Sequence, residues 1–225
     1  MPDQLFYRKK RSQRELSRKQ ESCKPYETVL IICEGIKTEI NYFENLCEEH
    51  KLGNVEITHI GSDPIHIVNE AIKRAEIKNG IEDRIYCVFD KDGRPTYEEA
   101  RRKIEEYNRK PGSESNPKID CIGSVPCFEI WVLLHFTYTA KPYNSKKGKK
   151  ISDVLEEAIK PYFPEYEKSL TNLYSRLKDH LPDACKHAKR LKEDNVKTKS
   201  TNPSTDLHEL VHYLEDLSKQ PKPYS

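Results

Sequence analysis

Acidic residues follow two apolar runs of this sequence. The run at residues 29–33, VLIIC, is followed by Glu34, and the run at 84–89 is followed by Asp90 and Asp92. If the two runs are neighbouring parallel strands, their carboxyl ends meet at one edge of a sheet, where the ligands of such sheets bind. Three carboxylates held together repel one another, and a hard cation is the simplest compensation. The pattern therefore predicts a Mg²⁺ or Mn²⁺ site formed by Glu34, Asp90 and Asp92.

The spacing of the two aspartates favours a shared ion. Residues two apart in an extended segment point to the same side, so Asp90 and Asp92 can bind one metal. Magnesium keeps several waters and takes substrate phosphate oxygens beside one or two carboxylates, so such a site faces a phosphate. Another interpretation stays open, because aspartate is common in the loops that follow strands.

Nearby residues have predicted roles in phosphoryl transfer. Glu34 is expected to bind metal or to act as a general acid or base. Lys37 or Lys91 is expected to stabilise negative charge on the phosphate, and Gly35 to let the backbone pass close to the substrate. Glu129 lies within the apolar segment CFEIWVLL, where an unpaired carboxylate is costly to bury. A functional role and a buried salt bridge are both open for Glu129.

Alternating strand and helix patterns predict an α/β fold with a mainly parallel sheet flanked by helices. The expected strands are residues 28–33, 55–60, 84–89 and 119–125. The expected helices between them are 39–49, one that opens at Asp63-Pro64, 97–108 and 127–136, with Thr38 as an N-cap and Thr96 with Glu99 as a capping box. From about residue 150 onward the patterns are helical, at 151–159, 165–179, 183–194 and 204–217.

The same patterns divide the chain into three parts. Residues 1–26 form a basic N-terminal arm and residues 27–140 the α/β domain. Residues 141–225 form a lysine-rich loop and a helical region that packs on that domain. At 225 residues the chain is long enough to bury a substantial core.

Positive charge is concentrated in blocks, although the formal net charge is only +2. Residues 1–24 hold eight Lys/Arg against three acids, and residues 141–150 hold five lysines. Such blocks suit a phosphate backbone, and solvated surface segments are the alternative interpretation. The candidate nucleic-acid contacts are Lys9, Lys10, Arg11, Lys91, Arg94, Lys146 and Lys147.

Other classes of protein are disfavoured. The N-terminus lacks the apolar region of a signal peptide and no apolar run could cross a bilayer, so we expect a cytoplasmic protein without membrane contact. The seven cysteines form no C-x-x-C pair. His208 and His212 match the H-E-x-x-H protease motif, but the following glycine and histidine of the extended pattern are Glu215 and Ser218 here. We interpret this match as a chance feature of an amphipathic helix.

Four segments together resemble the RloB-like family. They are CEGIKTEINYF at 33–43, VFDKDGRP at 88–95, PCFEIWVLLHF at 126–136 and NPSTDLHELV at 202–211. The resemblance implies a branch of the TOPRIM fold, in which a glutamate after the first strand and a D-x-D after the third bind metal. It adds Glu39 as a further metal ligand. Val125 stands where the family usually has asparagine.

The resemblance also implies a function. The family is associated with bacterial restriction-modification and abortive-infection loci, and an ATPase encoded alongside is an expected partner. We therefore expect a Mg²⁺-dependent nuclease of anti-phage defence that cleaves RNA, with tRNA as one candidate, or DNA. The alternative is a non-catalytic subunit that binds nucleic acid or the ATPase, and nucleotidyl transfer is a third possibility.

Overall fold

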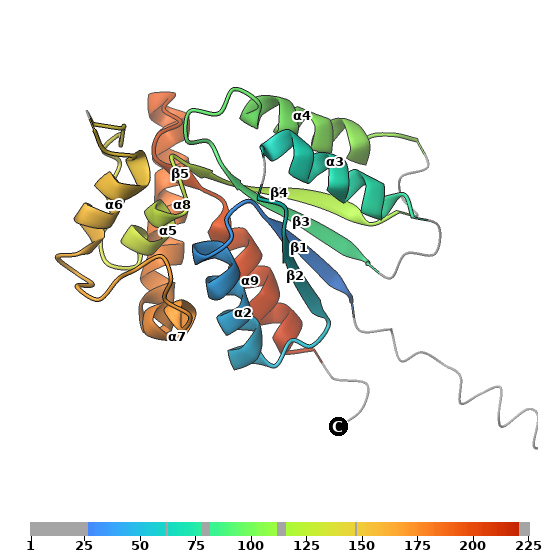
Figure 1. The fold of residues 1–225 in the computed structure, drawn as a ribbon, viewed down its shortest axis with the longest axis horizontal. Coiled ribbons are helices and arrows are strands. Elements are labelled where there is room, and N and C mark those ends of the chain that lie inside the picture. Colours follow the sequence, from blue (N-terminus) through green and yellow to red (C-terminus); the bar gives the residue numbers. More distant parts are fainter. Residues whose placement is uncertain (1–26, 62, 78–81, 112–115, 147, 221–225) are drawn as a thin grey trace, which may run out of the picture. The chain divides into compact units, whose positions relative to one another are not determined.

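The computed structural model describes residues 27–61, 63–77, 82–111, 116–146 and 148–220. In this part of the chain, five strands form one sheet in the order β2-β1-β3-β4-β5 (Figure 1). Their bounds are β1 Val29–Cys33, β2 Val55–His59, β3 Arg84–Asp90, β4 Lys118–Val125 and β5 Ser204–Thr205. The first four are parallel and β5 is antiparallel to β4. The predicted mainly parallel sheet is confirmed, but β5 lies where a helix was expected to begin.

Both faces of the sheet are covered, which explains why β1 is apolar throughout. Val29, Ile31 and Cys33 pack into one buried cluster and Leu30 and Ile32 into another. Figure 1 shows helices α3 and α4 on one face and α2 and α9 on the other. The bounds of these helices are α2 Thr38–His50, α3 Pro64–Ala75, α4 Tyr97–Asn108 and α9 Leu207–Ser218. Each fully buried aliphatic side chain contributes roughly 1.5–3 kcal/mol, so the two layers together stabilise this central strand.

The first turns of α2 and α4 differ from the predicted caps at Thr38 and Thr96. Asp63 caps α3 as expected, since its carboxylate accepts a hydrogen bond from the Ile65 N–H at 3.3 Å. The predicted capping box at Thr96 is wrong, because the Thr96 hydroxyl donates to the Asp63 carboxylate instead. Thr38 is the first residue of α2 and Lys37 is its N-cap. The Asp63–Thr96 bond thus links the starts of two successive helices.

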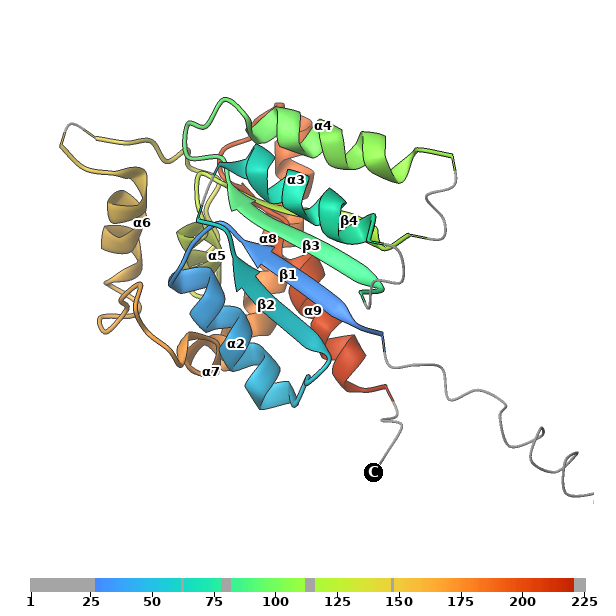
Figure 2. The same ribbon diagram turned by 45° about the vertical axis from the view of Figure 1, so that its right-hand side comes forward.

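The later part of the chain is helical and packs on the same body (Figure 2). It contributes α5 Glu129–Leu134, α6 Ile151–Ile159, α7 Leu173–Leu177, the 3₁₀ helix η2 Lys178–His180, and α8 Leu181–Thr198. The predicted helix at 165–179 is wrong over its first half. There the Lys160 ammonium donates to the carbonyls of Pro164 and Tyr166, at 3.1 and 2.7 Å, and holds a turn.

Residues Glu27–Lys219 form one compact unit. Every residue of α5 is buried, as its apolar sequence predicted, and α5 packs against α6 and α8. Helix α9 contacts β4 and α2. Within the described part of the chain, none of the helices has the length and apolar character of a membrane span.

His135 lies in this core and predicts a pH effect on stability. It is 1% exposed, its Nδ1–H donates to the Trp131 carbonyl at 2.9 Å, and burial lowers its pKa to about 4. The unfolded chain binds the proton with a pKa of about 6.5, so the stability that this neutral histidine contributes is present above that value and lost as pH falls. The expected loss between about pH 7 and pH 5 is about 2 kcal/mol.

The variant His135→Phe keeps a ring beside Trp131, whose ring centroid lies 4.8 Å from that of His135. We expect the free energy of unfolding of this variant, measured by urea titration at about pH 7 and about pH 5, to fall less than that of the wild type. The difference between the two losses should be about 2 kcal/mol. Equal changes in the two proteins would show that His135 is not the group responsible.

Candidate functional site

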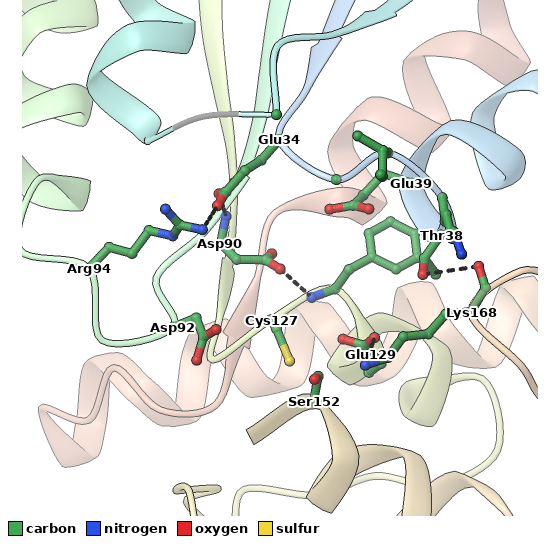
Figure 3. A pocket seen from close by; sticks show the side chains of 15 residues that line it. Glu34, Thr38, Glu39, Asp90, Asp92, Arg94, Cys127, Glu129, Ser152 and Lys168 are labelled. Carbon is green, nitrogen blue, oxygen red and sulfur yellow. Dashed lines mark hydrogen bonds and ion pairs between the residues drawn. The ribbon is translucent and has the colours of Figure 1, made fainter. Parts of the chain in front are cut away.

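Five carboxylates line a cavity of about 530 Å³ at the carboxyl ends of β1 and β3. These strands are neighbours, as predicted, with Cys33 opposite Val88. The acidic side chains come from Glu34, Glu39, Asp90, Asp92 and Glu129 (Figure 3). The structure therefore brings together all the predicted metal ligands and Glu129, in what we call the acidic cavity.

Glu34 is held by two partners on one side of this cavity. Its Oε1 lies 2.5 Å from Nη2 of Arg94, and its Oε2 accepts a hydrogen bond from the Asp90 N–H at 3.1 Å. Burial raises the pKa of Glu34, and the Asp90 N–H and the Arg94 guanidinium oppose that effect. Arg94, which the sequence suggested as a nucleic-acid contact, is thus a partner of a predicted metal ligand.

Asp90, Glu39 and Glu129 line the acidic cavity from β3, α2 and α5 (Figure 3). Removal from water raises the pKa of Asp90, and repulsion by Glu39, Glu129 and Glu34 raises it further. The Phe128 N–H, which donates to Asp90 Oδ2 at 3.2 Å, offsets part of this effect. Asp90 is therefore a carboxyl group whose ionised form its surroundings disfavour.

The other two acids of this group are nearly inaccessible to water. Glu39 is 7% exposed and Glu129 is 4% exposed. Burial, with repulsion by Glu129 and Glu34, raises the pKa of Glu39 to about 7, against opposing backbone hydrogen bonds. Burial also raises the pKa of Glu129, while the Cys127 thiol and the Lys168 ammonium oppose the rise. Glu129 thus lines the cavity and pairs with a partly exposed lysine, and its functional role stays a prediction.

The backbone at Gly35 passes close to Glu39. A Cβ atom at Gly35 would lie 1.9 Å from Oε2 of Glu39. The sequence suggested that this glycine makes room for a substrate. In the structure the room is filled by the Glu39 carboxylate, so Gly35 permits the placement of that acid.

Asp92 reaches the cavity by a different route from the one predicted. Its φ is 23° and its N–H donates to the Pro126 carbonyl at 2.9 Å, so the chain turns after Asp90 and is not extended. The expected extended backbone is therefore wrong, although both aspartates line the same cavity. The turn nevertheless leaves Asp92 in the cavity wall, where burial raises its pKa.

Lys168 is a cavity residue that the sequence did not indicate. Its Nζ lies 3.7 Å from Oε1 of Glu129 and 3.7 Å from Oδ1 of Asp153, and its carbonyl accepts a hydrogen bond from the Thr38 hydroxyl at 3.4 Å. Lys168 belongs to the segment wrongly predicted as a helix, and no local pattern marks it. Lys37, which was predicted, is exposed and lines the cavity.

The remaining predicted contacts lie elsewhere or outside the described residues. Lys91 does not line the acidic cavity; its Nζ pairs with Glu98 Oε1 at 2.9 Å, which disagrees with a role for Lys91 in charge stabilisation there. Lys146 is exposed and forms an isolated bridge with Lys149. Lys9, Lys10, Arg11 and Lys147 lie outside the residues that the structure describes.

The carboxylates have the chemistry of a hard-metal site but not its closed arrangement. Within the described ranges, no group of three or more His, Cys, Asp or Glu side chains is arranged to hold a metal ion. The reason is visible in the contacts, since Glu34 is held by Arg94 and Asp90 by the Phe128 N–H. Oxygen donors with an excess of negative charge fit Mg²⁺ or Mn²⁺ in kind.

The Gly35–Glu39 contact yields a prediction about the protonation of Glu39. In Gly35→Ala the added methyl group displaces the Glu39 carboxylate into the open cavity, where water stabilises its ionised form. The pKa of Glu39 should fall from about 7 towards its ordinary value, as measured by carbon-13 NMR of the side-chain carboxyl. The matched control is Gly53→Ala, since a Cβ at Gly53 meets no atom within 4 Å. An unchanged Glu39 titration in Gly35→Ala would contradict the assigned contact.

Comparison with known families is consistent with the four motif segments. A family model described as "RloB-like protein" matches residues 29–214, a span that includes all the described strands and all five cavity carboxylates. Searches of curated proteins and of solved structures gave no match. The match to the family model covers most of the chain, and the protein therefore belongs to the RloB-like family.

Proposed function

We propose that this protein is a Mg²⁺-dependent nuclease that cleaves phosphodiester bonds of RNA or DNA in bacterial anti-phage defence. The observation that carries the proposal is that Asp90 lies in one cavity, at the carboxyl edge of a parallel sheet, with Glu39 and Glu129, which have little access to water. Such an arrangement opposes folding unless its charges serve a ligand, and perturbed carboxyl groups in a cavity are typical of catalytic sites.

The residues that would hold the metal are Glu34, Asp90 and Asp92, with Glu39 as a further ligand. A divalent cation bound there supplies Lewis-acid stabilisation of the phosphate and activation of water. The TOPRIM resemblance supports this choice of residues, because the glutamate and the two aspartates occupy the positions of its metal-binding motif.

Cations of the chain itself would bind and orient the phosphate. Lys37 is exposed at the cavity, whereas Arg94 and Lys168 each pair with a cavity carboxylate. The Lys168 side chain is 34% exposed and its contacts are long, at 3.7 Å. The Asp153 side of this pairing is exposed and weak, so the ammonium can also reach a substrate phosphate while it stays near Glu129.

One observation favours a second candidate, a nucleic-acid-binding subunit without catalytic activity. Glu34 is held by Arg94, and the carboxylate oxygens do not converge on one point in the part of the chain that the structure describes. A binding subunit predicts nucleic-acid affinity that survives neutralisation of the carboxylates and an absence of turnover with any divalent metal. Three carboxylates facing a phosphate would weaken a protein that only binds, which is why we favour the nuclease.

One prediction of the proposed function concerns cleavage. Purified protein incubated with labelled tRNA, single-stranded DNA and duplex DNA should cut at least one of them in Mg²⁺ or Mn²⁺ and none in a chelator. Asp90→Asn and Asp92→Asn should each reduce the initial rate by about 100-fold or more, because each removes a charge that holds the metal. The product ends, identified by mass spectrometry, define the reaction.

The matched control is Glu48→Gln, which neutralises an exposed carboxylate on the same helix as Glu39. Its rate should stay within about twofold of the wild type. Equal cleavage by the two aspartate variants and the wild type would refute the assignment of the site. Binding without cleavage under all metal conditions would favour the second candidate.

Another prediction of the proposed function concerns the free energy of unfolding. At about pH 8 in a chelator, Asp90→Asn should unfold with a free energy about 1 kcal/mol higher than that of the wild type, because it relieves repulsion while its amide oxygen still accepts from the Phe128 N–H. Added Mg²⁺ or Mn²⁺ should raise the unfolding temperature of the wild type and not that of the variant. A destabilised Asp90→Asn and a wild type indifferent to both metals would contradict the assigned repulsion and the metal site together.

A further inference from the structure

A groove continues from the acidic cavity along the carboxyl edge of the sheet. Its first hollow, of about 370 Å³, shares Asp92 with the acidic cavity. Its second hollow, of about 420 Å³, shares Lys91, Val125 and Thr201 with the first. The three spaces thus follow one another over the ends of β3, β4 and β5. We call the two hollows together the edge groove.

The edge groove differs from the acidic cavity in its chemistry. Three cations, Lys91, Arg101 and Lys192, line its second hollow together with the carboxylates of Glu98 and Asp206, and Asp92 lines the first hollow. Hydroxyl and amide side chains line much of the rest; they include Asn144, Ser145, Ser200, Thr201 and Ser204. Ammonium, guanidinium, hydroxyl and amide groups are the side-chain donors that contact phosphate and sugar oxygens of nucleic acids. Cations therefore outnumber carboxylates in the second hollow, by three to two, whereas five carboxylates and three cations line the acidic cavity.

Lys192 is the groove cation most available to a ligand, because the partner of Arg101, Asp206, is only 20% exposed. Lys91 pairs with Glu98, Arg101 with Asp206, and Lys192 with Glu209. The Lys192 side chain is 58% exposed, and its partner Glu209 is 53% exposed. Exposed pairs of this kind contribute at most about 1 kcal/mol, so a phosphate can replace the carboxylate at little cost.

The turn after β3 separates the two environments. Asp90 faces the acidic cavity, whereas the next residue, Lys91, lines the edge groove. Asp92 borders both spaces. A strand of nucleic acid that crosses this turn would bring one phosphate to the carboxylates and the following phosphates to Lys91 and the groove.

We propose that the edge groove binds the phosphodiester backbone of a single nucleic-acid strand on one side of the bond that is cleaved. The inference rests on the proposed nuclease function and adds the path of its substrate. Each hollow has the volume of a site for a small ligand of nucleotide size. Among the described residues that line the groove, the single aromatic side chain is that of Tyr97, which is 3% exposed. The groove therefore holds the backbone by charge and hydrogen bonds, without base stacking.

Two variants test the groove without altering the acidic cavity. Thr201→Glu places a carboxylate where the two hollows meet, and Lys192→Glu reverses a charge of the second hollow. The control is Lys186→Glu, the same charge reversal at an exposed position of α8 that does not line the groove. All three positions are on the surface or at its edge, and circular dichroism verifies folding.

The readout is binding of a fluorescein-labelled single strand of about 12 nucleotides, as RNA and as DNA, by anisotropy in a chelator. We expect Thr201→Glu and Lys192→Glu to weaken binding by about tenfold or more, and Lys186→Glu by less than about twofold. The slope of log affinity against log salt concentration should become shallower by about 0.7 for each phosphate that the variant no longer neutralises.

The outcomes separate the groove from the proposed nuclease. Unchanged binding by both groove variants, or no binding of single strands by the wild type, overturns the groove even if Asp90→Asn abolishes cleavage. Weakened binding in the groove variants, in a protein that cleaves nothing with any divalent metal, supports the groove and overturns the nuclease. Weakened binding together with metal-dependent cleavage supports both.

Discussion

Repulsion among carboxyl groups that are shielded from water is the constraint around which this structure is arranged. Glu39, Asp90 and Glu129 come from α2, β3 and α5, and each has a raised pKa because burial and neighbouring acids disfavour its charge. An ion removed from water costs several kcal/mol unless it is paired. The Phe128 N–H at Asp90 and the Lys168 ammonium at Glu129 offset only part of this cost. The remaining free-energy cost is offset by burial of the apolar side chains that pack α2, β3 and α5 together.

The apolar core on one face of the sheet combines residues from the early and the late parts of the described chain. The face of the sheet that bears Tyr86 and Val88 is buried by the same cluster as residues of α5, α7, α8 and α9. Lys168, in the segment between α6 and α7, then reaches the cavity opened by residues of β1 and β3. The acidic cavity is thus assembled across the boundary that the sequence suggested at about residue 140, and it belongs to the compact unit as a whole.

The parts of the site that could be predicted are those that local pattern determines. Runs such as 29–33 are apolar because both faces of the strand are buried, and this marks where Glu34 and Asp90 emerge. The presence of Asp92 in the site was predicted, but its backbone path was not, because the turn depends on a hydrogen bond to Pro126, from a distant strand end. Lys168 could not be found at all, since its position depends on contacts with Thr38 and Glu129 that leave no periodic pattern in the sequence. The same holds for β5, whose two residues form a strand only because β4 offers an edge.

Because α9 is the last helix of the described chain, it is synthesised after the strands that it covers. Helix α9 packs on β4 and α2, and its Leu210, Val211 and Leu214 are wholly buried in the cluster that also holds Tyr42 and Phe43. Chains are synthesised from the N-terminus, so the face of the sheet that bears Tyr86 and Val88 stays without this cover until residues beyond 207 have emerged. An interrupted chain therefore leaves this face of the sheet partly uncovered, although the residues that line the acidic cavity, which end at Lys168, have all been synthesised.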